Sequence, residues 1–300
     1  MIIECENLAK RFRGHDAVRG VNLAVPQGAA LGLIGANGAG KTTMLRLLLN
    51  VLTPDGGSAR SLGVDSRHLR PRHFLRIGYV SENQKLPDRL TIAQYFAYLR
   101  SLYPNWDAAL EASLRQQFDL PPHRALGKLS HGMRMKTMPT GALSFRPEVL
   151  LLDEPLSGLD PLVRDEVMEG LIGQAGETTI VISSHELAEI EGSLTHMAFM
   201  ERGRVLFQDT IDDALGRFRS VSATLTRDLP RDAKFPDAWL SPRLSGQVLH
   251  FVDRAFRNEE TLRQQLTESV GAVHVLSAEP MSLRDLSKEL MRAGRTEARA

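Results

Sequence analysis

The segment GANGAGKTT, residues 35–43, constrains the fold of this chain more than any other part of the sequence. It fits the pattern G-x-x-x-x-G-K-[ST] and lies between ALGLIG (30–35), which predicts a strand, and KTTMLRLLLN (41–50), which predicts a helix. Glycines at these positions let backbone N–H groups surround phosphate oxygens, and the helix N-terminus adds favourable partial charge. A glycine-rich turn without a ligand is the alternative, and the order of strand, loop and helix argues against it.

The same segment supplies candidate ligands for a nucleotide. Lys41 is expected to reach the β- and γ-phosphates, and the hydroxyl of Thr42 is expected to bind Mg²⁺. The other candidates lie in the same loop and the first helical turn, and they are Gly35, Asn37, Gly38, Gly40 and Thr43. The spacing therefore predicts a site for a nucleotide with its magnesium ion.

Two adjacent carboxylates follow a second apolar run, EVLLLD (148–153), which predicts a strand buried on both faces. Asp153 ends this run, and an aspartate at this place is the usual partner of the Mg²⁺ shell in P-loop NTPases. Glu154 comes next, and a carboxylate beside a γ-phosphate can orient and deprotonate water. Two acids that only cap a strand are the alternative, which a phosphate loop in the same chain disfavours. We therefore expect Asp153 to bind the metal and Glu154 to be catalytic.

A histidine follows a third apolar run, TTIVISS (178–184), which also predicts a buried strand. His185 would lie at the carboxyl edge of this strand, where open α/β sheets place their ligands. A lone histidine is more often structural, so the spacing by itself leaves both interpretations open.

The bulk properties exclude several classes of protein. Of the 300 residues, 42% are hydrophobic and 24% are charged, which is the balance of a soluble globular protein. The net charge of +1 gives no strong field for nucleic acid, and a single cysteine excludes an internal disulfide. The start, MIIECENLAK, has acids where a signal peptide has a basic run, and no apolar run approaches the ~18 residues of a membrane span. We expect no nucleic-acid partner and no membrane crossing by this chain alone.

Residues 1–215 alternate short apolar strands with helical stretches, which predicts an α/β fold with a parallel core sheet. A run at 74–80 ends as a strand. The helical stretches at 92–103 and 108–118 belong to an expected helical subdomain at about 84–146. This part of the chain is therefore expected to form one large domain.

Residues 216–300 have a different pattern and predict a small α+β accessory domain. Strands are expected at 220–226 and 246–252, and helices at 258–268 and 282–294. The final residues, RTEARA, are expected to fray. A role in dimer contact or regulation and a role as a stabilising extension are both open.

Four segments, GLIGANGAGKTT, LSHGM, VLLLDEPLSGLDP and VISSH, follow one another in an order typical of one protein family. In these segments the chain resembles the ATP-binding subunits of ABC transporters. The resemblance covers about residues 2–210 and is much more specific than the phosphate loop alone. It implies the ABC form of the P-loop NTPase fold, ATP with Mg²⁺ as the bound nucleotide, and ATP hydrolysis.

The resemblance also implies roles for individual residues. Phe12 matches the aromatic residue that stacks on adenine, and His185 matches a switch histidine that contacts the γ-phosphate. LSHGM occupies the place of the family signature, usually LSGGQ, in which Ser130 and the N–H of Gly132 would contact ATP held by the other subunit. A helix start with free N–H groups suits such an anion. Asp160 is central to SGLDP, a segment that touches the opposite subunit.

The chain departs from the family pattern within and behind the signature. His131 replaces a glycine and Met133 replaces a glutamine. Further on, Pro139 and Gly141 stand where helix-forming residues are expected, and a proline inside a helix costs about 3 kcal/mol. We therefore expect a kink and reduced stability in this helix.

A third departure concerns Glu82, which the resemblance places among the residues that bind the nucleotide. Many relatives have a glutamine there that senses Mg²⁺ and the attacking water, and some exporter-type relatives carry a glutamate. An exposed loop acid without a role is the alternative. Together with LSHGM and the C-terminal region, Glu82 favours the branch that exports drugs, peptides, lipids or polysaccharides.

The leading hypothesis is therefore the ATPase subunit of an exporter, peripheral on the cytoplasmic face of the cell membrane and soluble when isolated. Its expected partners are separately encoded transmembrane permease subunits and a second copy of itself, arranged head to tail with ATP between the copies. The alternative is an ABC ATPase that acts on ribosomes or nucleic acid. Such relatives usually have two cassettes or a long coiled-coil insertion, and this sequence has neither. A catalytically silent subunit would normally lose Lys41, Asp153, Glu154 or His185, and all are present.

Overall fold

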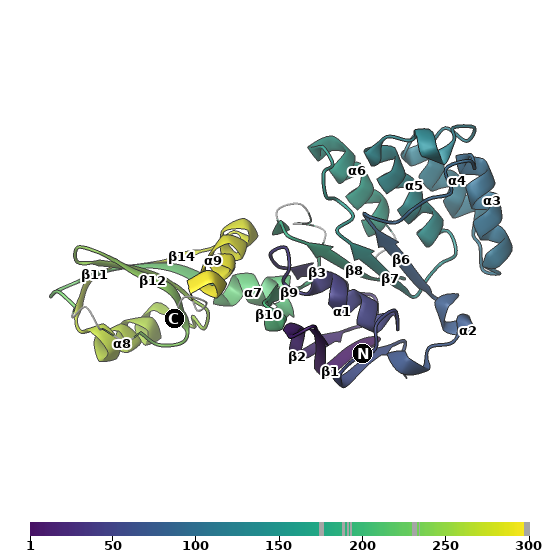
Figure 1. The fold of residues 1–300 in the computed structure, drawn as a ribbon. Helices are drawn as coiled ribbons and strands as arrows, with labels where there is room; N and C mark the ends of the chain where they lie inside the picture. Colours follow the sequence, from purple (N-terminus) through teal and green to yellow (C-terminus); the bar gives the residue numbers. More distant parts are fainter. Residues whose placement is uncertain are drawn as a thin grey trace. The chain divides into compact units, whose positions relative to one another are not determined.

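The computed structural model of the chain describes residues 1–173, 177–187, 190, 192, 194–229, 233 and 235–296. The chain divides into two compact units, Met1–Gln208 and Asp209–Ala300 (Figure 1). The domain boundary predicted near residue 215 lies within helix α7 (Ile211–Arg217) of the second unit. None of the described helices is both long enough and apolar enough to span a membrane.

The core of the first unit is a sheet of six strands in the order β10, β9, β3, β8, β7, β6. The strands are β3 (Ala30–Ile34), β6 (Ile77–Ser81), β7 (Val149–Asp153), β8 (Thr179–Ser184), β9 (His196–Glu201) and β10 (Arg204–Thr210). From β9 to β6, neighbouring strands are parallel. Every residue of β3, β7 and β8 is buried, because both faces of the sheet are covered. The predicted parallel core sheet is confirmed.

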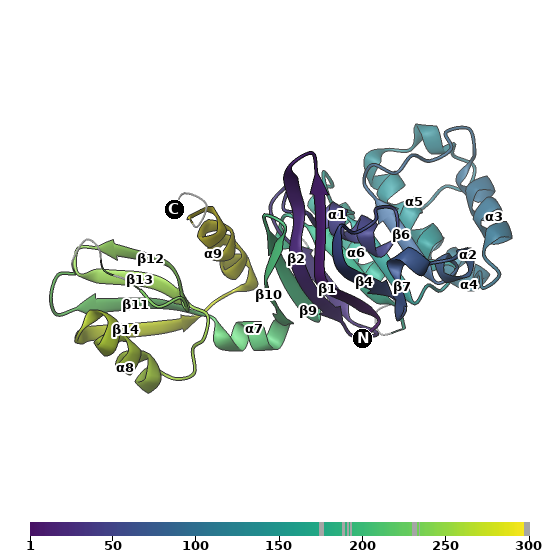
Figure 2. The same cartoon turned by 60° about the horizontal axis from the view of Figure 1, so that its bottom comes forward.

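A second sheet of the same unit is antiparallel, and the sequence pattern did not predict it. Its order is β2, β1, β4, β5, with the strands β1 (Ile3–Phe12), β2 (His15–Val25), β4 (Gly56–Ser61) and β5 (Val64–Asp65) (Figure 2). The pairing of β1 with β2 shifts register at three places. These irregularities break the alternation of inward and outward side chains, so a search for period 2 does not detect the strands.

Helix α1 (Lys41–Leu48) joins the two sheets through one apolar core. It packs against β2 and β4 of the antiparallel sheet and against β7 of the parallel sheet. Its side chains in this core are fully buried, and they are Met44, Leu45, Leu47 and Leu48. The phosphate loop that precedes α1 is therefore anchored to both sheets.

The remaining helices of the first unit lie mostly between β6 and β7 in the sequence, the part of the chain for which the helical subdomain at about 84–146 was predicted (Figure 1). They are η1 (Ser66–His68), α2 (Pro71–Phe74), α3 (Ile92–Leu102), α4 (Ala108–Gln117), η2 (Leu126–Lys128), α5 (His131–Leu143) and α6 (Pro161–Ile172). A short 3₁₀ helix and α2 precede β6, and α6 follows β7.

Helix α5 continues without a break across Pro139. The expected kink and reduced stability stay a prediction. Gly141 has a packing role, because a Cβ at this position would lie 2.8 Å from Leu99 Cδ1 and 3.5 Å from Phe96 Cε1. The glycine therefore lets α3 approach α5 closely, which explains a residue that disfavours helices in the middle of one.

The second unit is an α+β domain with a single antiparallel sheet, in the order β12, β13, β11, β14 (Figure 2). Its elements after α7 are β11 (Arg219–Leu225), β12 (Trp239–Ser245), β13 (Val248–Asp253), α8 (Glu259–Val270), β14 (Val273–Pro280) and α9 (Leu283–Thr296). Buried side chains of α8 share one apolar cluster with β11, β12 and β13, in which Trp239 of β12 stacks on Phe251 of β13 with ring centroids 4.1 Å apart. The predicted small α+β appendix is confirmed as a fold. Residues 297–300 of the tail RTEARA lie outside the described residues.

Candidate functional site

The register of the parallel sheet brings the ends of four strands to one edge. Ile34 of β3 pairs with Ser184 of β8, and Asp153 of β7 pairs with Ser81 of β6. The backbone N–H of Glu82, directly after β6, donates to the carbonyl of Asp153 at 3.2 Å. The phosphate loop, the two carboxylates, Glu82 and the histidine after β8 therefore all leave the sheet at its carboxyl edge, where such sheets bind ligands.

The phosphate loop is pressed against neighbouring backbone, and this explains its glycines. A Cβ at Gly35 would lie 2.1 Å from the carbonyl oxygen of Met200, and one at Gly40 would lie 2.3 Å from that of Ala17. Gly40 is also the N-cap of α1 and has a φ of 108°, which only glycine adopts easily. The remaining candidates of the loop and helix start are Asn37 and Gly38, which are exposed, and Thr43, which is partly exposed.

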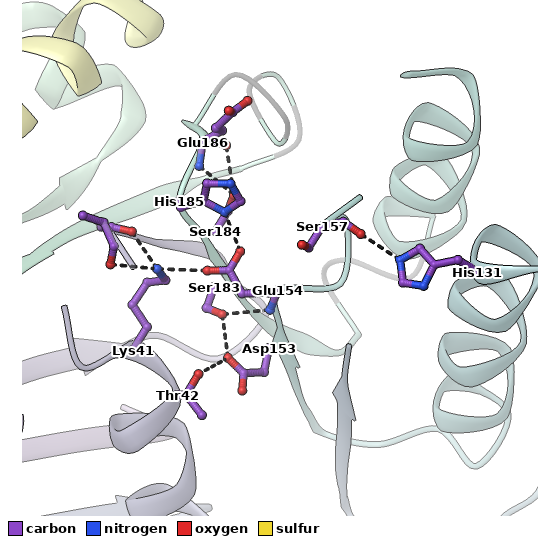
Figure 3. A network of polar contacts seen from close by, with 12 residues as sticks. Lys41, Thr42, His131, Asp153, Glu154, Ser157, Ser183, Ser184, His185 and Glu186 are labelled. Carbon is purple, nitrogen blue, oxygen red and sulfur yellow. Dashed lines mark hydrogen bonds and ion pairs between the residues drawn. The ribbon is translucent and has the colours of Figure 1, made fainter. Parts of the chain in front are cut away.

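Lys41 is the centre of a charged network (Figure 3). Its side chain is only 5% exposed, and Nζ donates to the carbonyl of Gly35 at 2.6 Å. Nζ also lies 2.9 Å from Oε1 of Glu154, and Oε2 of the same carboxylate lies 2.9 Å from Nδ1 of His185. The carboxylate of Glu154 thus bridges a buried cation and the histidine, so the structure brings three predicted residues into direct contact.

Asp153 is held by hydroxyl groups on both of its oxygens. Oδ1 accepts hydrogen bonds from Thr42 Oγ1 at 2.8 Å and from Ser183 Oγ at 2.9 Å. Oδ2 accepts one from the phenol of Tyr79 at 3.3 Å. Burial, and to a smaller extent the charge of Asp153, raises the pKa of Tyr79 above its ordinary value, so the phenol remains a donor at neutral pH.

Ser183 and Tyr79 are residues of the site that the sequence reasoning missed. Besides its bond to Asp153, Ser183 Oγ accepts a hydrogen bond from the backbone N–H of Glu154 at 3.0 Å. Ser184 completes this part of the site, because its Oγ accepts from the N–H of Glu186 at 3.0 Å and closes the turn around His185 (Figure 3). A polar residue inside an otherwise apolar strand marks such positions in the sequence, but it does not show which residue they contact.

The backbone of Glu154 is strained. Its φ is 51°, in the left-handed region, which costs a residue other than glycine on the order of 1–3 kcal/mol. Strand β7 ends one residue earlier, so this conformation turns the chain as soon as it leaves the sheet. Such strain concentrates at functional sites, and it is an observation on Glu154 independent of the sequence motif.

The predicted signature residues lie at the starts of two neighbouring helices. Ser130 is the N-cap of α5, with its hydroxyl accepting from the N–H of Met133 at 3.3 Å. Asp160 is the N-cap of α6 and accepts from the N–H of Val163 at 3.1 Å. Gly132 lies against α6, because its Cβ would be 3.2 Å from Val163 Cγ1. Among the described residues, no polar contact joins these helix starts to the lysine of the phosphate loop.

Phe12 lies at the last position of β1, paired with His15 in the hairpin to β2. It is 41% exposed, and Nζ of Lys10 lies 5.6 Å from the centre of its ring. The ring is therefore available for stacking with a planar ligand, although the described contacts do not connect it with the phosphate loop.

Comparison with known proteins places these observations in a family. A family model described as ABC transporter matches residues 18–157. The chain is 31% identical over 230 residues to the ABC transporter ATP-binding protein YtrB of Bacillus subtilis (strain 168), a match that covers 76% of this chain and 78% of that protein. It is 35% identical over 217 residues to the daunorubicin resistance ATP-binding protein DrrA2 of Streptomyces coeruleorubidus, with 70% and 67% covered.

Solved structures of ABC transporter ATP-binding proteins share this fold. A solved structure of an ATP-binding subunit of an ABC transporter superposes with a TM-score of 0.65 at 25% identity. The superposition covers 71% of this chain and 92% of that one.

Proposed function

This chain belongs to the family of ABC transporter ATP-binding proteins, and we propose that it is the ATP-hydrolysing subunit of a membrane exporter. ATP binding and hydrolysis are the activity of the family. The observation that carries the proposal is the contact of Lys41, Glu154 and His185 at the carboxyl edge of the sheet. That arrangement unites a phosphate-binding cation, a base and a switch histidine within one network.

Lys41, Thr42 and Asp153 would hold ATP with its magnesium ion. Lys41 binds the β- and γ-phosphates from the phosphate loop. The Thr42 hydroxyl and the Asp153 carboxylate are 2.8 Å apart and offer hard oxygen ligands, which Mg²⁺ prefers. The described residues contain no cluster of three or more His, Cys, Asp or Glu side chains suited to a metal. This donor set fits an ion that is bound largely through the phosphates of the nucleotide.

Glu154 acts as the general base in this proposal, and His185 orients it. Water attacks the γ-phosphorus and gives a proton to the Glu154 carboxylate, while the bond from the γ-phosphorus to the bridging oxygen breaks, so that ADP leaves and inorganic phosphate forms. Nδ1 of His185 holds one oxygen of that carboxylate, and Ser183 holds its backbone N–H. One contact holds the side chain of Glu154 and the other holds its backbone. The folded protein therefore orients the carboxylate before ATP binds.

Ser130, Gly132 and Asp160 serve ATP held by a second copy of the chain in this proposal. The start of α5 presents free backbone N–H groups, which attract a γ-phosphate. The same helix starts have no described polar contact with their own phosphate loop, which favours a partner as the source of the nucleotide. Glu82 lies at the same edge as Asp153 and completes the proposed nucleotide-binding set, together with Phe12 for adenine.

The exporter assignment extends beyond the family. It is supported by similarity to DrrA2, whose name refers to daunorubicin resistance, and by Glu82 and the LSHGM signature. Transmembrane permease subunits encoded separately would dock the chain on the cytoplasmic face of the membrane, and residues 216–300 would form the accessory domain. An ABC ATPase that acts on ribosomes or nucleic acid is the alternative, disfavoured by a single phosphate loop and a net charge of +1.

Purification from membranes tests the exporter proposal. We expect the tagged chain to co-purify from detergent-solubilised membranes of its host with a protein that has several apolar segments of ~20 residues. ATP hydrolysis by this complex should respond to candidate cargo, because cargo is bound by the membrane subunits. Nuclease treatment is the control, since it removes ribosomes and nucleic acid without disturbing a permease. Recovery with ribosomes or nucleic acid and without a membrane protein would support the alternative.

A tethered pair of subunits tests whether the signature acts on the partner's ATP. One half carries Lys41→Ala and the other Gly132→Asp, whose carboxylate should repel a γ-phosphate. Both halves carry Glu154→Gln, so that captured ATP persists. If the signature serves the partner, one site has both lesions and the other has none. We therefore expect the mixed pair to retain ATP at one site after rapid gel filtration.

The matched controls are tethered pairs with the same lesion in both halves and a pair with neither. Pairs with the same lesion in both halves should retain no ATP, and the pair with neither lesion should retain ATP at both sites. If each signature served its own phosphate loop, every site of the mixed pair would carry one lesion. No retained ATP in the mixed pair, with normal retention in the intact pair, would therefore contradict the shared site.

A further inference from the structure

His131 links the start of the signature helix to the loop between β7 and α6. It is the first residue of α5, and its Nε2 lies 2.8 Å from the backbone carbonyl oxygen of Ser157 (Figure 3). Ser157 opens SGLDP, the segment that contains the N-cap of α6, Asp160, and ends at the first residue of that helix, Pro161. The contact joins residues that are 26 positions apart in the chain. It is made by the side chain that departs from the family signature, and a glycine could not make it.

The chemistry of this contact defines the state of the imidazole. A carbonyl oxygen only accepts hydrogen bonds, so Nε2 must carry a proton. The neutral tautomer protonated on Nε2 and the imidazolium both satisfy this condition, whereas the tautomer protonated on Nδ1 does not. Next to the carbonyl, Gly158 has a φ of 68°, and a Cβ there would lie 3.7 Å from Nε2 of His131. The ring therefore lies directly against the turn of the loop.

Other contacts join α5 and α6 directly, and α6 also holds the loop, because Nη2 of Arg164 donates to the carbonyl of Leu159 at 3.3 Å. Lys136 of α5 forms an ion pair with Glu166 of α6, and Gly132 allows close approach to Val163. Both lie on the helices, after the loop has ended. Within the loop, the backbone hydrogen bonds of the described residues are local turns, from the N–H of Ser157 to the carbonyl of Glu154 and from the N–H of Leu159 to the carbonyl of Leu156. Among the polar contacts of the described residues, the one made by His131 joins this loop to α5, the signature helix.

We propose that His131 is a positioning residue that holds residues 157–160 and the start of α5 as one rigid surface for the second copy of the chain. This inference rests on the proposed function, because it concerns the surface that would face the partner's ATP. The hydrogen bond fixes the position of the loop before the second copy binds. Dimer formation therefore does not carry the entropy cost of ordering the loop. Without the bond, the same loop must be fixed during dimer formation, which weakens the dimer.

Two substitutions separate the hydrogen bond from the bulk of the ring. His131→Gln keeps an N–H donor at a similar distance from the backbone, whereas His131→Leu keeps apolar volume and has no donor. Both are made in the full chain with Glu154→Gln, and dimer formation in ATP is measured by analytical ultracentrifugation. We expect His131→Gln to dimerise like its parent and His131→Leu to dimerise about three- to tenfold more weakly, the range for one hydrogen bond. Equal dimerisation of the leucine variant and the parent would overturn the proposal.

The protonation of the ring is a second and direct measurement. In the full chain labelled with ¹⁵N-histidine, the ring nitrogen shifts of His131 are assigned by comparison with the His131→Gln spectrum. A proton on Nε2, in the neutral or the charged ring, is the expected result. The tautomer protonated on Nδ1 would overturn the proposal, because Nε2 would then repel the carbonyl. A merely structural role for the ring volume would not select between the tautomers.

The outcomes also distinguish this inference from the proposed function. Nucleotide binding to the chain's own phosphate loop, measured with a fluorescent ATP analogue, should be the same in the parent and both variants, which also shows that they are folded. If the Glu154→Gln parent does not dimerise in ATP, the proposed function fails. If the parent dimerises and the leucine variant does so equally well, only the role of His131 fails.

Discussion

Replacement of Glu154 by glutamine lowers steady-state ATP hydrolysis by on the order of 10²–10⁴-fold, the expected cost of removing a general base. Glutamine has nearly the same shape, and its amide oxygen can still accept a hydrogen bond from Lys41, which lies 2.9 Å from Oε1 of Glu154. Its NH2 group takes the place of Oε2 and can donate to Nδ1 of His185 when that nitrogen carries no proton. What is lost is the ability to take a proton from water. ATP binding should therefore persist, and the ATP-bound dimer should accumulate.

Phosphate release and nucleotide binding, measured on the same preparation, check this expectation. Glu186→Gln is the matched control, because Glu186 is a carboxylate two residues from Ser184 at the same edge of the sheet and only its backbone takes part in the described contacts there. This control should hydrolyse ATP at a rate close to that of the parent. Turnover near the parental rate in Glu154→Gln itself would refute the role of this residue as the base.

Replacement of Lys41 by alanine removes tight ATP binding. Its ammonium group is 5% exposed and paired with Glu154, so the substitution leaves a partly buried carboxylate without its cation. A bound γ-phosphate would then face the negative charge of Glu154 without compensation. Truncation of one partner of a buried charge pair in a binding site costs about 2–5 kcal/mol of binding free energy, which corresponds to a loss of ATP affinity between about 30-fold and about 5,000-fold.

Isothermal titration with ATP and Mg²⁺ measures this loss, and circular dichroism shows whether the variant is folded. Lys136→Ala is the matched control, because Lys136 is also a largely buried lysine in an ion pair, with Glu166, but lies on α5. It should bind ATP with parental affinity. An unchanged ATP affinity in folded Lys41→Ala would show that the phosphates are bound elsewhere.

Sequence and structure differ in what they reveal about the site around Asp153. The pattern EVLLLD followed by glutamate predicts a buried strand that ends in two acids, and β7 has this form. Neither Tyr79 nor Ser183 belongs to a pattern that would connect it with Asp153, although each donates a hydrogen bond to it. Their contacts depend on which strands lie side by side, and a single sequence does not contain that information.

The antiparallel sheet shows the same limit in the fold. The fully buried strands β3, β7 and β8 are continuous apolar runs, so the sequence predicts them directly. Strand β9, which also belongs to the parallel sheet, was not predicted. Strand β1 was missed because its pairing with β2 shifts register three times, which breaks the regular alternation of side chains. The helices at 92–103 and 108–118 were predicted to within about two residues of α3 and α4, because their periodicity is local.

The sequence by itself determined the phosphate loop, the order of its motifs, the buried strands and the two-part composition of the chain. These features are local, because a loop around phosphate or an apolar strand needs particular residues at fixed spacing. Only the tertiary structure decided that Glu154 bridges Lys41 and His185, that Ser183 links Asp153 to the backbone of Glu154, and that His131 reaches Ser157. Such contacts join distant parts of the chain through strand register and helix packing, and they form only when the whole sheet and its helices have assembled.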